Sequence, residues 1–287
     1  MSLYPAFARP RDLGQAAEIM GSLSTGAMII AGGQEVMPSV NYGALMPEVY
    51  IDVGQIAALK GISEENGAIQ IGSFTVHRDV QQSDVIQNNL PLLSYAAAQI
   101  GGGMQVHNRG TIGGNIVSMH PLYDILPSLL ALGADVDILK DGDEQRMALA
   151  DLMKDASHGL GSESLLVRVL LKPMTPDAGW AYEKLKITAG GYGSANAAAI
   201  VTLDSDKITS LRIIVGAVSA LPVDISDALS DCRGQAWSEH LAGEIEAKAS
   251  AAIKDPLSDH QGDGDWRRAM AGVMARRAIE AAVKRAG

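Results

Sequence analysis

The chain has 287 residues, of which 47% are hydrophobic, so it can bury a sizeable core and global disorder is excluded. A formal net charge of −10 disfavours nucleic acids and anionic membranes as partners, because both attract cationic surfaces. Cys232 is the only cysteine, which excludes an intrachain disulfide and any four-cysteine zinc or iron–sulfur site within this chain.

The first predicted segment, residues 1–56, has the pattern of a βαβ unit. Apolar residues at helical spacing predict a helix over residues 13–23. Short apolar runs at residues 27–30 and 49–53 predict two strands, and the first of them ends in a glycine pair.

The second predicted segment, residues 57–174, mixes strands and helices. An alanine-rich helix is expected over residues 93–100, and a run of glycines beginning at Gly101 stops it. A leucine-rich buried helix is expected over residues 122–132, with Gly133 in the C′ position. Further apolar patterns predict strands over residues 68–73, 135–139 and 165–171.

Pro173 and Pro176 mark the start of the third segment, residues 175–287. Strand patterns followed by helical ones predict a smaller α+β domain with a three-stranded antiparallel sheet. The strands are expected over residues 180–186, 197–203 and 208–217, and the helices over residues 239–253 and 266–286. The last helix is either a docked helix with a basic outer face or a partner-binding face, formed by Arg267, Arg268, Arg276, Arg277, Lys284 and Arg285.

A glycine pair, Gly113 and Gly114, lies between Thr111 and Asn115 in the stretch VHNRGTIGGNIVSMHPLYD. Adjacent glycines let the backbone approach a bulky anion and adopt positive φ. Threonine and asparagine add short groups that bind phosphate oxygens or satisfy a tight turn. Alone, such a pair is most often an ordinary turn.

A second glycine pair, Gly32 and Gly33, follows the predicted strand in IIAGGQEV at residues 29–36. Two strand-to-glycine turns can converge on one extended ligand, and a dinucleotide pyrophosphate has a suitable length and charge. The spacing fits neither G-x-G-x-x-G nor G-x-x-x-x-G-K-[ST], which argues against a Rossmann or P-loop site.

The two glycine segments, AGGQ at 31–34 and NRGTIGGN at 108–115, resemble the FAD-binding medium subunit of the molybdenum hydroxylases, the group of xanthine dehydrogenase and carbon monoxide dehydrogenase. The segments PEVYIDVGQI, IGSFTVHRDV, YEKLKITAGGY and the tail at 255–277 resemble family segments in the same order, so the resemblance covers nearly the whole chain. It implies an α+β fold. A two-part FAD-binding domain of the PCMH type, as in the vanillyl-alcohol oxidase superfamily, would precede the smaller C-terminal domain.

The resemblance implies that both glycine turns wrap the FAD pyrophosphate. Glu35 stands where many family members have serine. Because a carboxylate beside a phosphate costs Coulomb energy, we expect Glu35 to face a ribose hydroxyl or a backbone N–H. The implied contacts are Ile30, Ala31, Gly32, Gly33, Gln34, Glu35, Val36, Thr111, Ile112, Gly113, Gly114 and Asn115.

For the flavin end, the resemblance implies contacts from Asp124, Lys186 and Tyr192, and Gly101 is a further implied contact of the cofactor. A lysine near the flavin ring would stabilise the negative charge that develops at N1 on reduction. The residue types also allow a helix-dipole position for Asp124, a solvated strand edge for Lys184 and Lys186, and a core position for Tyr192. Gly191 stands where the family has an acidic residue, so the loop conformation does not follow from the resemblance.

Neither a metal site nor a catalytic residue is predicted in this chain. His77, His107, His120, His158, His240 and His260 show no HxxxH or HxH spacing. His77 matches a family histidine, and the alternative is that it caps the next helix.

The resemblance implies an oxidoreductase subunit that takes electrons from two [2Fe–2S] clusters and passes them to an external acceptor. The clusters and a molybdenum cofactor would lie on a small iron–sulfur subunit and a large molybdenum subunit, in a dimer of heterotrimers. The alternatives are a stand-alone flavin-dependent reductase and a flavin-free assembly module. The substrate and the final acceptor are not encoded in this chain.

Cysteine usage and the N-terminus predict a cytoplasmic protein. A single cysteine fits a reducing compartment, and MSLYPAFARP carries no Sec-type signal. No stretch reaches about 18 uninterrupted apolar residues, so no transmembrane helix is expected.

Overall fold

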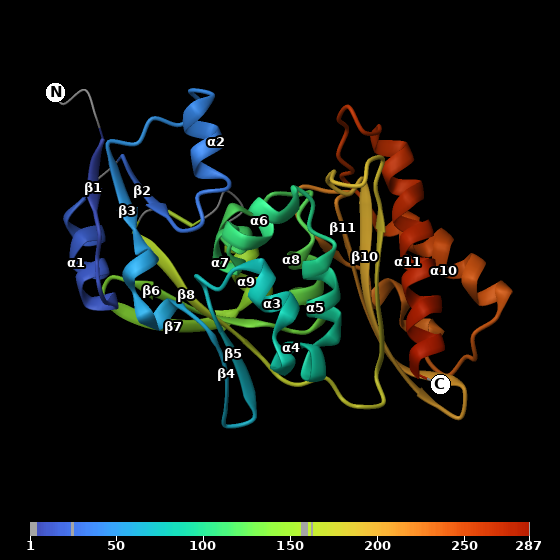
Figure 1. The fold of residues 1–287 in the computed structure, drawn as a ribbon. Coiled ribbons are helices and arrows are strands. Elements are labelled where there is room, and N and C mark those ends of the chain that lie inside the picture. Colours follow the sequence, from blue (N-terminus) through green and yellow to red (C-terminus); the bar gives the residue numbers. More distant parts are fainter. Residues whose placement is uncertain (1–4, 24–25, 156–159, 162, 287) are drawn as a thin grey trace. The chain divides into compact units, whose positions relative to one another are not determined.

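The computed structural model describes residues 5–23, 26–155, 160–161 and 163–286 (Figure 1). Over this range the chain forms two compact units from alternating segments. Unit 1 is Met1–Val85, Met104–Met119 and Ala134–Lys172, and unit 2 is Ile86–Gly103, His120–Gly133 and Pro173–Gly287. The sequence-based division at residues 56 and 174 stays a prediction.

Unit 1 begins with a small parallel sheet in the order β1-β3-β2. Its strands are β1 (Ala6–Ala8), β2 (Ala27–Ile30) and β3 (Val49–Asp52). The Asp12 carboxylate caps helix α1 (Leu13–Ser22) by accepting a hydrogen bond from the Gln15 N–H at 2.8 Å. Helix α2 (Val36–Asn41) follows β2, and the 3-10 turns η1 (Val53–Gln55) and η2 (Ala57–Leu59) follow β3.

An antiparallel five-stranded sheet, in the order β4-β5-β8-β6-β7, completes unit 1. Its strands are β4 (Ile62–Glu65), β5 (Ala68–Gly72), β6 (Asp135–Lys140), β7 (Asp143–Ala148) and β8 (Ser164–Leu171). The helices of this part are α3 (His77–Gln82), α6 (Gly103–Arg109), α7 (Ile112–Ser118) and α9 (Leu149–Asp155). Helix α4 (Asp84–Asn89) spans the boundary between the two units.

One apolar core joins the two sheets of unit 1. Ile51 of the parallel sheet, Met20 of α1 and Leu165 of the antiparallel sheet belong to the same buried cluster. Because such burial is the main favourable term in folding, the two sheets form one compact unit. The end of β2 is therefore held on a scaffold shared with β6 and β8.

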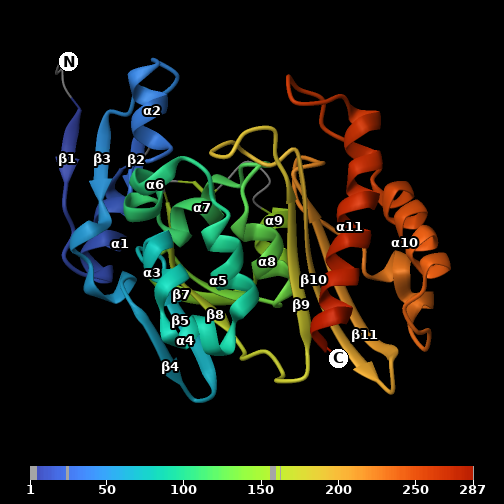
Figure 2. The same cartoon turned by 45° about the vertical axis from the view of Figure 1, so that its right-hand side comes forward.

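Unit 2 is built on an antiparallel four-stranded sheet in the order β12-β11-β10-β9 (Figure 2). The strands are β9 (Gly179–Leu185), β10 (Ala195–Asp204), β11 (Lys207–Gly216) and β12 (Val223–Asp224). Its helices are α5 (Pro91–Ala98), α8 (Ile125–Ala131), η3 (Asp227–Cys232), α10 (Glu239–Ala252) and α11 (Gly264–Ala286). Helices α10 and α11 bury one core with β10 and β11, which includes Ala197, Ile213, Ile245 and Ala275.

Two expectations for the C-terminal part are wrong in detail. The sheet has four strands rather than three, because β12 is only two residues long and leaves no readable alternation. Arg267 does not lie on the basic outer face of the last helix. It is fully buried and donates to the backbone oxygens of Ser194 and Ala217 and to the Asp259 carboxylate.

None of the helices in the described part of the chain combines the length and the hydropathy that crossing a bilayer requires.

Candidate functional site

The first glycine pair lies directly after β2 in unit 1, where the strand ends at Ile30. Gly33 has a φ of 71°, a left-handed conformation that a side chain would strain. In the described residues, the backbone N–H groups of Gly32, Gly33 and Gln34 donate no hydrogen bond. Successive N–H groups around a left-handed residue form a concavity that suits an anion.

Gly32 packs against the segment that leads into the second glycine pair. A Cβ at this position would overlap the Arg109 carbonyl oxygen and would lie 3.2 Å from the Gly110 Cα. Only glycine permits this approach. Gly110 directly precedes Thr111, the N-cap of α7, so the segments that carry the two glycine pairs lie side by side within unit 1. That a ligand binds there stays a prediction.

The second glycine pair does not form the predicted strand-to-glycine turn. It lies in the first turn of α7, after α6 and a single β-bridge between Val76 and Thr111. Positive φ is found at Gly33 but at neither Gly113 nor Gly114. At Gly113 the absence of a side chain serves packing instead, because a Cβ there would lie 2.6 Å from the Ser73 Cβ.

The N–H groups at the start of α7 already have acceptors within unit 1. The first turn of a helix has no intrahelical partners for its N–H groups, so these bonds stabilise α7. The donors are Ile112 to the Thr75 oxygen at 2.9 Å, Gly113 to the Ser73 oxygen at 2.9 Å and Gly114 to Thr111 Oγ1 at 3.1 Å.

Asn115 is the residue of α7 with an unsatisfied buried atom. Its side chain is 7% exposed, and Oδ1 has no hydrogen-bond partner in the described chain. A buried acceptor without a partner costs free energy, so it points to a polar group that binds there. By rotation, the same amide can present its NH2 instead of its oxygen.

His77, the first residue of α3, contacts Gly110, which lies three residues before the second glycine pair. Its N–H donates to the Gly110 oxygen at 3.0 Å, and a Cβ at Gly110 would lie 2.9 Å from His77 Cδ2. The side chain makes no capping hydrogen bond, so the capping alternative is wrong. Burial, and then the nearby His107, lowers the pKa of His77 from 6.5 to about 4.

Asp124 is the centre of a buried polar cluster in unit 2. Lys184 Nζ lies 2.8 Å from Asp124 Oδ2, and the Tyr182 hydroxyl donates to Oδ1 at 2.8 Å. The side chains of Asp124 and Lys184 are each 3% exposed. Asp124 occupies the N-cap position of α8 but makes no capping hydrogen bond, so its main interactions are with Lys184 and Tyr182 rather than with the helix dipole. Lys184 is not on a solvated edge, and that alternative is wrong.

The electrostatics of this cluster follow from its burial. Burial raises the pKa of the Asp124 carboxyl above its usual value, and the charge of Lys184 opposes that shift. Burial and the neighbouring carboxylate raise the pKa of Tyr182 well above 10. Tyr182 therefore keeps its proton at neutral pH and donates a hydrogen bond to Asp124. Sequence reasoning missed Tyr182, although its i,i+2 spacing to Lys184 places both on one face of β9.

The other predicted residues of unit 2 lie in the loop after β9 or against it. A Cβ at Gly101 would overlap the Gly190 oxygen, and Gly102 N–H donates to that oxygen at 3.1 Å. Lys186 Nζ donates to the Ala189 oxygen at 3.1 Å on the exposed loop. The Gly191 N–H donates to the Thr188 oxygen at 3.2 Å, which defines a turn where the family likeness left the conformation open.

Tyr192 is 47% exposed, so the core alternative for this residue is wrong. Its ring stacks on His120 with a centroid distance of 5.3 Å, and the Tyr123 ring lies 5.9 Å away. Unit 2 thus brings Tyr192 next to the residue that precedes Asp124. Contact of Gly101, Asp124, Lys186 or Tyr192 with a cofactor stays a prediction.

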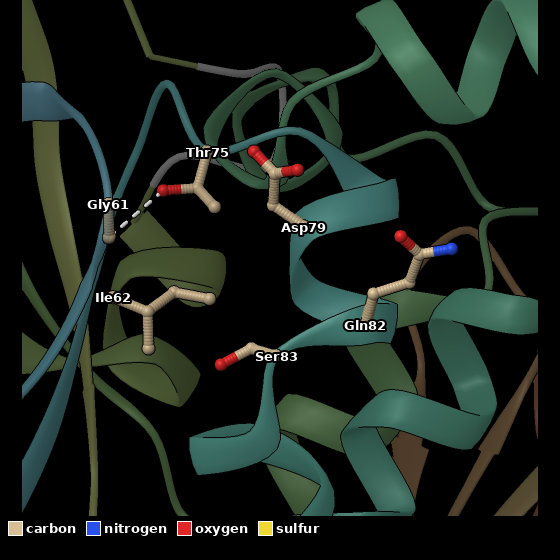
Figure 3. Close-up of a pocket in the computed structure, with 6 residues that line it drawn as sticks. All are labelled: Gly61, Ile62, Thr75, Asp79, Gln82 and Ser83. Atoms are coloured by element: carbon tan, nitrogen blue, oxygen red, sulfur yellow. Dashed lines mark hydrogen bonds between the residues drawn. The ribbon is translucent and has the colours of Figure 1, made fainter.

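A separate hollow of about 290 Å³ lies on unit 1 and contains no predicted site residue (Figure 3). In the lining of this hollow, the Thr75 hydroxyl donates a hydrogen bond to the Gly61 backbone oxygen at 3.1 Å. Gly61, Ile62, Thr75, Asp79, Gln82 and Ser83 line it. The described residues hold no group of three or more His, Cys, Asp or Glu side chains that could bind a metal ion, and His158 lies outside them.

Two family models match the chain in succession. "FAD binding domain in molybdopterin dehydrogenase" matches residues 4–173, and "CO dehydrogenase flavoprotein C-terminal domain" matches residues 180–282. Each half of the chain therefore has a counterpart among known domains.

Curated relatives cover nearly the full length of the chain. The carbon monoxide dehydrogenase medium chain of Hydrogenophaga pseudoflava is 33% identical over 275 residues, which is 95% of each chain. Caffeine dehydrogenase subunit beta of Pseudomonas sp. (strain CBB1) is 26% identical over 97% of this chain and 95% of that one.

Solved structures have the same fold. The structure of carbon monoxide dehydrogenase from Hydrogenophaga pseudoflava that lacks the Mo-pyranopterin moiety contains a chain with a TM-score of 0.91 to this one. The two are 30% identical, and the match covers 99% of each. This likeness confirms the predicted α+β fold of an FAD-binding domain followed by a C-terminal domain.

Proposed function

The chain belongs to the family of FAD-binding medium subunits of molybdenum hydroxylases, and we propose that it is the electron-transfer subunit of a heteromeric enzyme of this kind. FAD is its cofactor, and the chain is an oxidoreductase subunit. The observation that carries the proposal is the close contact of Gly32, in the first glycine pair, with Gly110, in the segment that leads into the second pair. A convergence of this kind supports one extended nucleotide across both.

The donors of unit 1 fit a diphosphate. In our proposal the N–H groups of Gly32, Gly33 and Gln34 bind its oxygens, since they have no other acceptor in the described residues. Next to the second pair, the Asn115 side-chain amide has an oxygen without a partner in the described residues, so this amide would bind the nucleotide. The flanking Ile30, Ala31, Glu35, Val36, Thr111, Ile112, Gly113 and Gly114 would shape this surface.

Gly101, Asp124, Lys186 and Tyr192 are our proposed contacts for the flavin end. Tyr192 offers a partly exposed aromatic face, and Lys186 offers a cation on an exposed loop. Asp124 would act through Lys184 and Tyr182, which occupy its carboxylate. When bound, FAD supplies the ability to accept electrons one or two at a time. The chain's own residues bind and orient it.

The single cysteine decides where the rest of the electron path lies. Cys232 cannot ligate a [2Fe–2S] cluster alone, and it is 1% exposed. We therefore place two clusters and a molybdenum cofactor on a small and a large partner subunit, in a dimer of heterotrimers. The acceptor is an external molecule, and we expect the assembly in the cytoplasm.

The proposal is tested by purifying the tagged chain from its native cells. We expect iron, acid-labile sulfide, molybdenum and FAD to co-purify with it in constant ratio. A chain that turns over a substrate by itself would instead be a stand-alone reductase. A chain with neither flavin nor metal-bearing partners would be an assembly module, and the proposal would be wrong.

A further inference from the structure

The loop that joins β9 to β10 in unit 2, residues 186–194, has little packing of its own, and we name it the β9–β10 loop. Residues 186–190 are exposed to solvent, and Tyr192 is 47% exposed. A loop with few buried contacts opens readily unless its ends are held. Because this loop carries Lys186 and Tyr192, two of our proposed flavin contacts, the groups that hold its ends decide where those contacts lie.

The two ends of the β9–β10 loop are held by different groups. Lys184, two residues before the loop, donates to Asp124 and to the Gln99 backbone oxygen, the latter at 2.9 Å. At the other end the Ser194 N–H donates to the Leu185 oxygen at 2.8 Å, which closes the hairpin. Ser194 is 0% exposed, and its carbonyl and hydroxyl are bound by residues 259–267, the segment that leads into α11.

Arg267, in the first turn of α11, binds the carbonyl of Ser194. Its side chain is 0% exposed, and Nη1 donates to the Ser194 backbone oxygen at 2.7 Å. The same nitrogen donates to the backbone oxygen of Ala217, which directly follows β11, and Nη2 donates to the Asp259 carboxylate at 2.6 Å. The guanidinium is planar and its donors are fixed in direction, so it joins the last residue of the loop rigidly to the end of the neighbouring strand.

Gln261 adds a second contact to the same residue. The Ser194 hydroxyl donates to Gln261 Oε1 at 2.9 Å. The Gln261 N–H donates at 2.8 Å to the Asp259 carboxylate that also pairs with Arg267, so the two contacts to Ser194 are linked. Figures 1 and 2 show the connection between β9 and β10 and the start of α11 at the same end of the four-stranded sheet.

The burial of Arg267 is unfavourable and is not needed to dock the helix. Removing a guanidinium from water is costly, and the Asp259 side chain that pairs with it is itself 29% exposed. Arg267 Nε has no hydrogen-bond partner in the described chain, which adds to the cost. Helix α11 already buries Ala271, Ala275 and other apolar residues in the core that it shares with β10. The buried arginine is therefore better explained by the backbone oxygens that it holds in place than by packing.

The position of Ser194 is passed on to Tyr192, which lies two residues before it. Gly193 lies between them and is buried, and a Cβ there would be 3.3 Å from Lys184 Cε. The Tyr192 ring stacks on the His120 ring with a centroid distance of 5.3 Å. Because only one buried residue separates Ser194 from this stack, a shift of Ser194 displaces the Tyr192 ring.

We propose that Arg267 and Gln261 are positioning residues for the flavin, and that they act by fixing Ser194. The position of Ser194 then sets where Lys186 and Tyr192 contact the cofactor. The inference rests on the proposed function. A loop that is already ordered loses less conformational freedom when FAD binds, so these contacts raise the affinity for FAD. They also fix the surroundings of the flavin ring, on which its electronic properties depend.

The test uses the tagged chain in its native complex, with FAD removed and added back, and the variants Arg267→Met and Gln261→Ala. In Arg267→Met we expect amide hydrogen exchange of residues 186–193 in the FAD-free complex to accelerate roughly tenfold, and FAD affinity to fall roughly tenfold, because hydrogen bonds from a charged group are lost. Gln261→Ala loses one neutral hydrogen bond, so both changes should be about threefold. The absorbance bands of the rebound flavin should shift in both variants, while iron and molybdenum per chain stay constant.

Arg276→Met is the matched control. Arg276 also lies in α11, and its ion pairs are with Glu246 and Glu280 rather than with the β9–β10 loop. This variant should change neither the exchange of residues 186–193 nor the FAD affinity. Gln261→Glu should restore both quantities to wild-type values, because a carboxylate oxygen can still accept the hydrogen bond from the Ser194 hydroxyl.

Three results would overturn the inference. The first is wild-type loop exchange and FAD affinity in Arg267→Met. The second is faster loop exchange with unchanged FAD affinity and flavin absorbance, since the contacts would then order the loop without serving the cofactor. The third is an equal acceleration in the amides of β10 and β11, which would mean that Arg267 only stabilises the fold. A wild-type complex that binds no FAD refutes the proposed function instead. If Arg267→Met fails to fold, Gln261→Ala decides the question, because that side chain is only partly buried.

Discussion

The turn at Gly32–Gly33 and the helix start at Gly113–Gly114 lie in one unit, yet they use glycine for different physical reasons. The first contains a left-handed residue, with a φ of 71° at Gly33, and N–H groups that have no acceptor in the described chain. The second has its N–H groups satisfied by Ser73, Thr75 and Thr111. Its glycine Gly113 lets α7 pack against Ser73.

This difference shows what a repeated letter pattern can conceal. The first pair provides backbone N–H donors, whereas the second allows close packing and positions the side chain of Asn115. Both functions need a residue without Cβ, so the sequence shows the same two letters. Substitutions that remove one function and leave the other separate the two pairs experimentally.

The largest effect is expected from Gly32→Ala, which breaks the contact between the segments that carry the two pairs. The new methyl group would overlap the backbone of Arg109 rather than a flexible side chain. Overpacking costs about 3 kcal/mol of folding stability at the upper end. The chain can relieve that cost by moving the two segments apart, and because FAD is proposed to need both, its affinity for the complex should fall by up to roughly a hundredfold. FAD per chain in the purified complex, titrated with added FAD, measures it.

Gly21→Ala is the control for this substitution. Gly21 lies in helix α1 of the same unit, and a Cβ there meets nothing within 4 Å. It should leave FAD binding unchanged and raise helix stability slightly. If Gly32→Ala binds FAD as tightly as Gly21→Ala, the contact of Gly32 with Gly110 does not form the nucleotide site.

A smaller effect is expected from lowering the pH, which protonates His77. His77 packs against Gly110, in the segment that leads into the second glycine pair. Its pKa is about 4 in the folded chain, below the ordinary 6.5, so the unfolded chain takes up the proton first as pH falls. Stability from this group is complete above pH 6.5 and is lost as pH falls towards 4. Between pH 7 and pH 5 the loss should be about 2 kcal/mol.

Urea unfolding of wild type and His77→Gln at both pH values isolates this contribution. Glutamine does not titrate, so the difference in unfolding free energy between pH 7 and pH 5 should shrink by about 2 kcal/mol in the variant. All other titrating groups are common to both proteins. Equal pH dependence in the two would mean that His77 is not the buried neutral support of Gly110.

The elements with a strong local signal could be predicted from the sequence. Strand β2 begins and ends at the predicted residues, because an aliphatic run is cut off by glycine. Gly133 has a φ of 66° and ends α8 as a C′ glycine should. The alanine-rich pattern predicts a helix over residues 93–100, and α5 is Pro91–Ala98, a shift of two residues at each end.

The elements that depend on distant contacts could not be predicted. The start of α7 contains two glycines and has poor helix propensity, and backbone oxygens of Ser73 and Thr75 hold it from about 40 residues away. Asp124 and Lys184 form their pair across 60 residues of sequence. Strand β7 is exposed along most of its length, so no alternation of apolar residues marks it.

The smallest effect, and the most direct test of the second pair, is expected from Asn115→Leu. The substitution keeps the branched shape and the number of side-chain heavy atoms, and it removes a buried oxygen that has no partner in the described chain. The FAD-free chain should therefore be as stable as wild type or more so, whereas FAD affinity should fall about fivefold, the equivalent of one hydrogen bond of about 1 kcal/mol. A gain or no change in stability together with a loss of FAD affinity distinguishes a ligand contact from a structural role.

Gln105→Leu, on the exposed face of α6, is the control and should change neither the stability nor the FAD affinity. If Asn115→Leu lowers the stability of the FAD-free chain and leaves FAD affinity intact, the second glycine pair only packs, and the first pair binds the nucleotide without it.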